Sequence, residues 1–136
     1  MKYFYLLLLL VPSFVAADIY VVVNANSAVG KLELEDVTDL YLGRKKVLGT
    51  LYVNQVLDRH GEGRQRFFYR VAKMEESQVN AYWAKLKFSG RMRAPENIHS
   101  NEELLIKLQE NPQAIGYMLE PPSLDSGVKV VLKIDE

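Results

Sequence analysis

Two glycines and three arginines lie close together near the middle of the sequence. Gly61 and Gly63 are separated by one residue, and Arg59, Arg64 and Arg66 flank them. A Gly-x-Gly stretch that opens a helix can expose main-chain N–H groups, and the helix dipole adds partial positive charge there. Glycine lets an anion approach the backbone, and guanidinium groups supply forked donors. The pattern predicts a site for phosphate or a carboxylate; the alternative is an ordinary strand-to-helix turn with surface arginines.

A second group of polar residues follows the first expected strand. Asn24, Asn26 and Ser27 could form hydrogen bonds to a ligand, and Ser27 is the candidate taken from this group. The same residue types are also common turn formers, which need no ligand to explain them. Both interpretations stay open from the sequence.

The sequence argues against an enzyme. His60 and His99 are the two histidines, and three or four metal ligands cannot be assembled around them. Nothing like Gly-x-Ser-x-Gly is present, and Gly61-x-Gly63 lacks the other residues of a Walker or Rossmann motif. The absence of cysteine excludes disulfides, thiolate metal sites and cysteine catalysis. We therefore expect recognition, without catalytic residues, a metal or a cofactor.

The segments that must position these residues alternate between strand and helix. Apolar β-branched runs predict strands, and apolar residues at helical spacing predict helices. Strands are expected at 19–23, 51–57, 114–119 and 128–134, and helices at 34–41, 64–74, 75–89 and 101–110. This order predicts an α/β domain whose sheet is covered by helices. Phe67, Phe68 and Trp83 are expected in its core.

Length and composition fit one exported domain. The chain has 136 residues, 17 basic and 17 acidic side chains, and no cysteine. This length suits a single domain, and the neutral total argues against a general nucleic-acid binder. Residues 1–17 combine Lys2, an apolar run and small residues before position 18, which predicts a secretory signal peptide, with an uncleaved anchor as the alternative. The mature domain is expected to span 18–136, in the periplasm or outside the cell.

Charge is distributed unevenly along the mature chain. Residues 59–93 carry 9 basic and 3 acidic groups, whereas residues 94–136 carry 3 basic and 8 acidic groups. The middle third is therefore basic and lies between acidic segments. This charge distribution predicts either solvated helix faces paired with acidic neighbours or a surface that attracts anions.

Three stretches, in this order, resemble the type 2 periplasmic binding protein family, specifically the phosphate-binding proteins of ABC importers. Residues 34–44 resemble its acidic helix ending in Gly and a basic residue, and Asn111-Pro112-Gln113-Ala114-Ile115-Gly116-Tyr117 resembles its Pro-Gly-Ala-Ile-Gly-Tyr segment. Arg59-His60-Gly61-Glu62-Gly63-Arg64 lies where the family has its Gly-Ser-Gly-Thr phosphate loop. The resemblance implies a single lobe with a central mixed sheet flanked by helices. The expected ligand-binding residues are Ser27, Arg59, Gly61, Glu62, Gly63 and Arg64.

The loop departs from the family pattern at two positions. Glu62 stands where the family has Ser, and Arg64 stands where it has Thr. A carboxylate repels a bound dianion unless it is protonated, turned away or paired with an arginine. We therefore expect weak binding of phosphate, or binding of a different acidic group.

Two functions remain after these exclusions. The first is a solute-binding domain for a small oxyanion, with phosphate as the first candidate and an ABC-type uptake system as a partner. A homodimer could supply the wall that one lobe lacks. The second is a periplasmic interaction or scaffold protein that has lost high-affinity ligand binding, with its basic middle third docking an acidic envelope protein.

Overall fold

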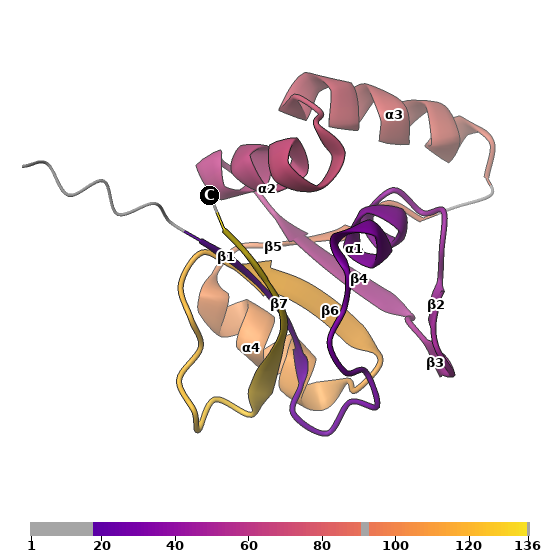
Figure 1. The fold of residues 1–136 in the computed structure, drawn as a ribbon. Coiled ribbons are helices and arrows are strands. Elements are labelled where there is room, and N and C mark those ends of the chain that lie inside the picture. The colour runs from indigo at the N-terminus through magenta and orange to yellow at the C-terminus, as the bar shows by residue number, and fades with distance from the viewer. Residues whose placement is uncertain (1–17, 91–92, 136) are drawn as a thin grey trace, which may run out of the picture.

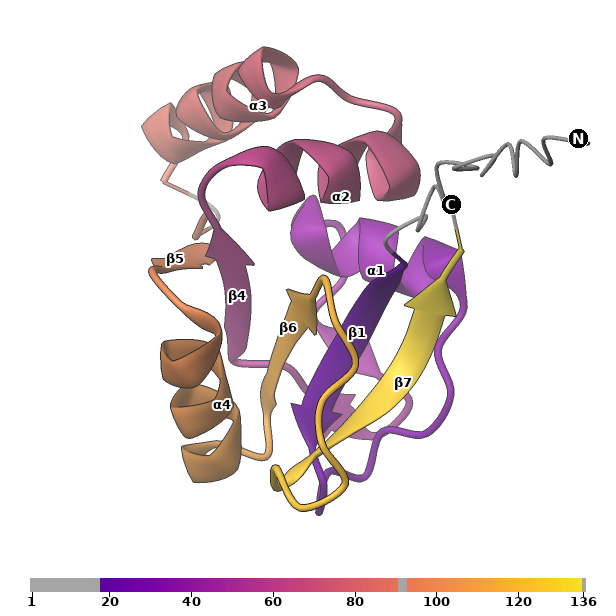
Figure 2. The ribbon, with the colours of Figure 1, turned by 90° about the vertical axis from the view of Figure 1, so that its left-hand side faces the viewer.

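The computed structural model describes residues 18–90 and 93–135, which form a mixed sheet with helices on both faces (Figure 1). Five strands make the sheet in the order β5-β4-β6-β1-β7, which Figure 2 shows from left to right. Their bounds are β1 (Ile19–Asn24), β4 (Gln55–Arg59), β5 (Glu96–Ile98), β6 (Ala114–Met118) and β7 (Val128–Ile134). This architecture confirms the expected mixed sheet flanked by helices. The expected signal peptide lies outside the described residues.

Strand direction divides the sheet into two halves. β1 pairs antiparallel with both β6 and β7, whereas β4 is parallel to both β5 and β6. Val23 of β1 and Val56 of β4 both face Ile115 of β6, but the two strands run in opposite directions. As a result, the loop after β1 and the loop after β4 leave the sheet at opposite ends.

Three helices cover one face of the sheet and one covers the other (Figures 1 and 2). On the first face lie α1 (Leu34–Tyr41), α2 (Glu62–Ala72) and α3 (Glu76–Phe88). They share a core cluster with one side of the sheet, and α3 packs outermost, against α2. The other face is covered by α4 (Asn101–Glu110), which has its own smaller cluster. Phe67, Phe68 and Trp83 belong to the larger cluster, as expected.

Local signals explain where these helices begin and end. The Ser100 hydroxyl accepts a hydrogen bond from the N–H of Glu103 and caps α4, and the Glu103 carboxylate accepts the N–H of His99. Asp36 accepts the N–H of Glu33 at the start of α1. Lys73 caps the end of α2 with a φ of 53°, in the left-handed conformation typical of a helix end.

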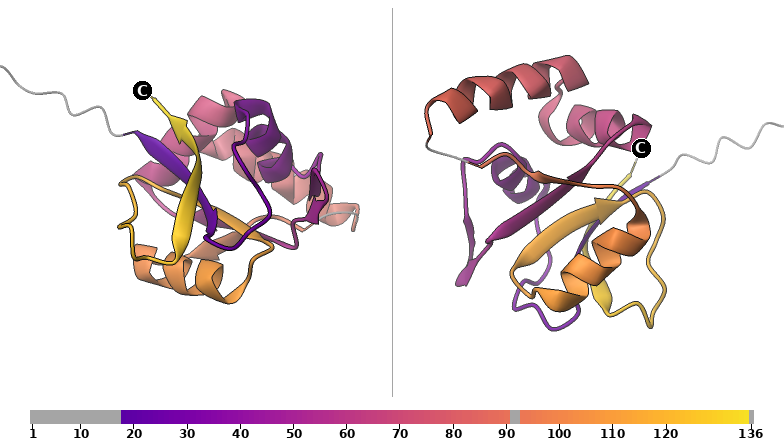
Figure 3. Two further views of the ribbon diagram at one scale, coloured as in Figure 1. Left: turned by 60° about the horizontal axis from the view of Figure 1, so that its bottom comes forward. Right: turned by 180° about the vertical axis from the view of Figure 1, so that it is seen from behind.

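The strand expected at 51–57 is divided into two. β3 (Leu51–Tyr52) pairs with β2 (Val47–Leu48) in a separate two-stranded hairpin, and β4 starts only at Gln55. Figure 3 shows this hairpin beside the beginning of β4. Neither β2 nor β5 was expected from the sequence, because segments of two or three residues carry too few side chains to show a period. The hairpin and the start of β4 form one wall of a cleft described below.

Candidate functional site

Gly61 begins α2 in a conformation that favours glycine. Its φ is 87° and its ψ is −160°, and a side chain at this position would meet nothing within 4 Å. The carbonyl of Gly61 accepts the N–H groups of Arg64 and Gln65. Among the described residues no acceptor contacts the N–H groups of Glu62 and Gly63. This is the usual state of the first N–H groups of an α-helix, here of 11 residues.

Gly63 is glycine for a different reason. A Cβ built at this residue would lie 2.7 Å from Cδ1 of Leu119 and 3.3 Å from Cδ of Arg59. The Leu119 side chain therefore covers the Cα of Gly63. Close packing, rather than open space for a ligand, accounts for this glycine.

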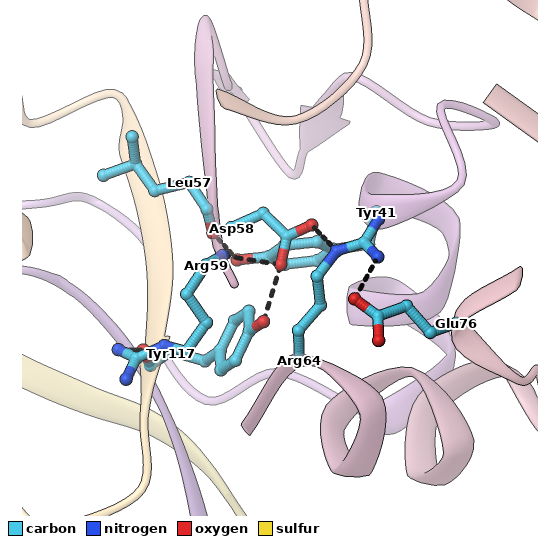
Figure 4. A network of polar contacts seen from close by, with 7 residues as sticks. All are labelled: Tyr41, Leu57, Asp58, Arg59, Arg64, Glu76 and Tyr117. Carbon is cyan, nitrogen blue, oxygen red and sulfur yellow. Dashed lines mark hydrogen bonds and ion pairs between the residues drawn. The ribbon is translucent and has the colours of Figure 1, made fainter. Parts of the chain in front are cut away.

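Arg64 points into the protein (Figure 4). Its Nε donates to Oδ2 of Asp58 at 2.9 Å, and its Nη1 donates to Oε1 of Glu76 at 3.1 Å. Only 9% of Arg64 is exposed. Burial alone lowers the pKa of this guanidinium, but the hydrogen bonds and charges of Asp58 and Glu76 outweigh burial and raise it. The charge of Arg64 is therefore used to join β4, α2 and α3.

Asp58 is the centre of this buried network. Its Oδ1 accepts the Tyr117 hydroxyl at 2.6 Å and the N–H of Arg59 at 2.8 Å. The Tyr41 hydroxyl donates to the carbonyl of Leu57 in the same region at 2.7 Å. Burial, followed by the negative charge of Asp58, raises the pKa of both tyrosines. Both hydroxyls therefore remain protonated donors.

Arg59 points away from Arg64, toward the start of α4 (Figure 4). Its Nη2 donates to the carbonyl of Tyr117 at 2.6 Å and to Oδ1 of Asn101 at 2.9 Å. Its Nε is buried and, among the described residues, has no acceptor. The guanidinium lies 5.2 Å from the centre of the Tyr117 ring. Arg59 is therefore held in position on one side while part of its donor capacity stays unused.

A small pocket lies beside Arg59, at the carboxyl ends of β4 and β5. It has a volume of about 150 Å³ and is lined by Arg59, His60, Ile98, His99 and Ser100. The rings of His60 and His99 stack, with centres 6.0 Å apart. Both α2 and α4 begin directly after the strands that end here. We call these five residues the carboxyl-end pocket.

Glu62 does not line the carboxyl-end pocket. It lines a separate hollow on the outer side of α2, together with Gln65, Arg66, Tyr69, Arg70 and Glu75. The repulsion expected between Glu62 and a bound anion therefore does not apply to an anion held beside Arg59.

Ser27 lies at the other end of the sheet. Its hydroxyl accepts the N–H of Val29, and the neighbouring Asn24 side chain donates to the carbonyls of Leu108 and Gln109 at the end of α4. Both residues are buried and serve the local turn and the helix end. The structure does not bring Ser27 together with the loop at 59–64, so one small ligand cannot contact both.

Several residues of the site were missed in the sequence. Asp58 was expected in a loop but ends a buried strand, and Tyr117 was expected only as a strand residue. His99 and Ser100 line the pocket between β5 and α4, and Asn101 contacts Arg59, about 40 positions after Arg59 in the sequence. The one signal in the sequence that pointed to a charged partner for these arginines was Asp58, directly before Arg59.

Within residues 18–90 and 93–135, no group of three or more His, Cys, Asp or Glu side chains could hold a metal ion. No helix in the described part of the chain is long and apolar enough to cross a membrane.

Comparison with solved structures shows the fold to be that of phosphate-transport binding proteins. A protein assigned as a phosphate ABC transporter substrate-binding protein, with bound phosphate, from Clostridium perfringens matches at a TM-score of 0.64 and 20% identity. An ABC-type phosphate transport receptor from Vibrio cholerae matches at a TM-score of 0.59 and 19% identity. The matches cover 85% of this chain but only 45% and 47% of those chains. No protein-family model and no curated protein sequence matches the chain. The chain thus has the fold of one lobe of a periplasmic-binding-protein-like structure and spans less than half the length of these two proteins.

Proposed function

We propose that this protein is an exported solute-binding-like domain that recognises a small oxyanion, with phosphate as the first candidate, in the carboxyl-end pocket. The unused donors of Arg59 carry the proposal. They lie where two parallel strands end and two helices begin, and helix starts attract negative charge. An oxyanion at this place would accept hydrogen bonds that the protein itself leaves unmade.

The fold supports this proposal but the loop changes its details. The two similar solved structures are phosphate-transport proteins, one with bound phosphate. In this chain Arg64 is engaged by Asp58 and Glu76, and Leu119 covers Gly63. Arg59 and His60, which both line the pocket, are the remaining donors. A single lobe leaves a bound ion partly open to water, so we expect weaker binding than in a closed two-lobed site.

The alternative, an interaction or scaffold protein, rests on the pairing of Arg64 with Asp58 and Glu76. A loop whose arginine has become part of the core can hold the lobe together without any ligand. In that case the lobe would act through its surface, with an acidic envelope protein as the partner. An ABC-type transporter, or a second copy of the chain that closes the pocket, belongs to the first function.

Titration calorimetry of residues 18–136 with phosphate and sulfate tests the proposal. We expect binding to the unmodified protein, and a loss of about tenfold or more in affinity in Arg59→Met, because charge-assisted hydrogen bonds are lost. Lys85→Met is the matched control, since Lys85 is an exposed cation on α3. Thermal melts must show that Arg59→Met is folded. No heat with either anion, or equal affinity in the two variants, contradicts oxyanion recognition and leaves the scaffold function.

A further inference from the structure

A second cleft lies at the opposite ends of the same two parallel strands. It has a volume of about 660 Å³, within the usual range of ligand sites. Its walls come from the connection after α1, from the hairpin and the start of β4, and from Gly90 and residues 93–96. β4 rises about 13 Å from Gln55 to Arg59. This cleft is therefore separate from the carboxyl-end pocket, and we call it the amino-end cleft.

The floor of the amino-end cleft is apolar. Leu40 and Val53 are buried, and Val56 is half-buried beside them. Tyr52 lies at the edge and is 50% exposed. An apolar floor with an aromatic edge suits a ligand that has apolar surface to bury. An inorganic ion has no such surface.

The rim of the amino-end cleft is cationic. Lys45, Lys46 and Arg93 line it, against a single carboxylate, Glu96. Lys45 forms an ion pair with Asp36 at 3.0 Å. Within the described residues, neither Lys46 nor Arg93 has an ion-pair partner, so both charges face solvent and the cleft.

The carboxylate on this rim is already neutralised. Glu96 accepts hydrogen bonds from Lys107 and from Nε2 of Gln55, both at 2.8 Å. These two hydrogen bonds, that of Lys107 being the stronger influence, lower the pKa of Glu96 and keep it charged but paired. The net field in the cleft is therefore set by the two unpaired cations.

We propose that the amino-end cleft binds an amphiphilic organic anion, a molecule with an aromatic or aliphatic body and at least one carboxylate, sulfonate or phosphate group. The body would pack on the floor and against Tyr52, and the acidic group would lie between Lys46 and Arg93. Aromatic and aliphatic bodies bury surface, and the two cations select the sign of the charge. This ligand class differs from the small oxyanion of the carboxyl-end pocket.

A pair of matched dyes tests the charge and the body separately. The probes are 8-anilinonaphthalene-1-sulfonate and its neutral counterpart N-phenyl-1-naphthylamine, titrated into residues 18–136 and followed by fluorescence and by amide chemical shifts. We expect the sulfonate to bind more tightly and to move the amides of Lys46, Val53 and Gln55. Equal binding of both dyes, or shifts confined to other surfaces such as the exposed Phe88, overturns the proposal.

Charge reversal on exposed residues identifies the cations. Lys46→Glu with Arg93→Glu should weaken sulfonate binding by about tenfold, the effect of losing two modest charge contacts. Lys85→Glu with Lys87→Glu makes the same change in net charge on α3, outside the cleft, and should leave the affinity unchanged. All four side chains are exposed, so both double variants should fold. Equal loss in the two double variants, or no loss in either, overturns the assignment of these cations.

Discussion

The two ends of β4 use positive charge in opposite ways. At its carboxyl end, Arg64 is buried and joined to Asp58 and Glu76, and Arg59 is partly engaged by Tyr117 and Asn101. At its amino end, the cations are exposed on flexible stems around an apolar floor. Arginine therefore mainly stabilises the fold at the carboxyl end, where only part of Arg59 is left unused, whereas the exposed cations at the amino end remain available to a ligand.

The difference shows why a motif alone does not identify a binding site. The Gly-x-Gly and arginine pattern has the geometry of an anion loop, but burial turned one of its arginines into a structural residue. A buried charge must be paired, because leaving it unpaired costs much more than a surface contact returns.

The largest expected effect comes from breaking the carboxyl-end network. Asp58→Ala leaves the Arg64 guanidinium and the Tyr117 hydroxyl without their main acceptor and should lower the free energy of unfolding by about 3–5 kcal/mol. Urea denaturation measures the loss. The double variant Asp58→Ala with Arg64→Met removes the unpaired charge as well and should be more stable than Asp58→Ala alone. If the double variant is less stable than Asp58→Ala alone, the unpaired buried charge of Arg64 is not what destabilises the single variant.

The sequence predicted the parts of the fold that depend on local patterns. β1, α1, α3 and α4 follow apolar periods or capping residues and were located to within one residue at most ends. β2, β3 and β5 exist only because tertiary pairing holds segments of two or three residues in place. No periodicity exists over such lengths, so local reasoning misses them.

The candidate site was predicted only in part, because some of its features also depend on tertiary structure. Gly61 has a positive φ, one of the strained conformations that glycine was expected to permit in this loop. The inward turn of Arg64 depends on Asp58 becoming part of a buried strand, which a loop assignment for 58–63 did not allow. The separation of Ser27 from the loop depends on β1 and β4 running in opposite directions. Strand direction follows from the whole topology rather than from either segment.

Filling the space above Gly63 gives the next largest effect. Gly63→Ala places a Cβ 2.7 Å from Leu119 and should destabilise the protein by about 1–3 kcal/mol, through overpacking. Gly30→Ala is the matched control, because a Cβ there meets nothing within 4 Å, and its free energy of unfolding should change by less than about 0.5 kcal/mol. If the two alanine variants have equal urea midpoints, Leu119 yields freely and the loop has room for a ligand after all.

A smaller effect is expected where the carboxyl-end network reaches the surface. Glu76→Gln removes the charge of the more exposed partner of Arg64 but leaves Asp58 in place. The side chain of Glu76 is 39% exposed, so the loss should be about 0.5–1 kcal/mol, as for surface pairs. Added salt should reduce the difference between Glu76→Gln and the unmodified protein. A loss as large as that of Asp58→Ala would show that Glu76, and not Asp58, neutralises Arg64.

The smallest effect lies at the amino end and concerns pH. Hydrogen bonds from Lys107 and Gln55 hold the pKa of Glu96 below its ordinary value, so the folded protein holds the charged form more strongly than the unfolded chain does. Stability from this group is present above pH 4.5 and is lost as pH falls through the lowered pKa of the folded state. Glu96→Gln should therefore reduce the urea midpoint near neutral pH, and the difference from the unmodified protein should shrink on acidification. Since Glu96 is 47% exposed, solvent screens the pair and the change should be small beside that of Asp58→Ala. A difference that stays constant between neutral and acidic pH would show that Glu96 acts through neutral hydrogen bonds rather than through its charge.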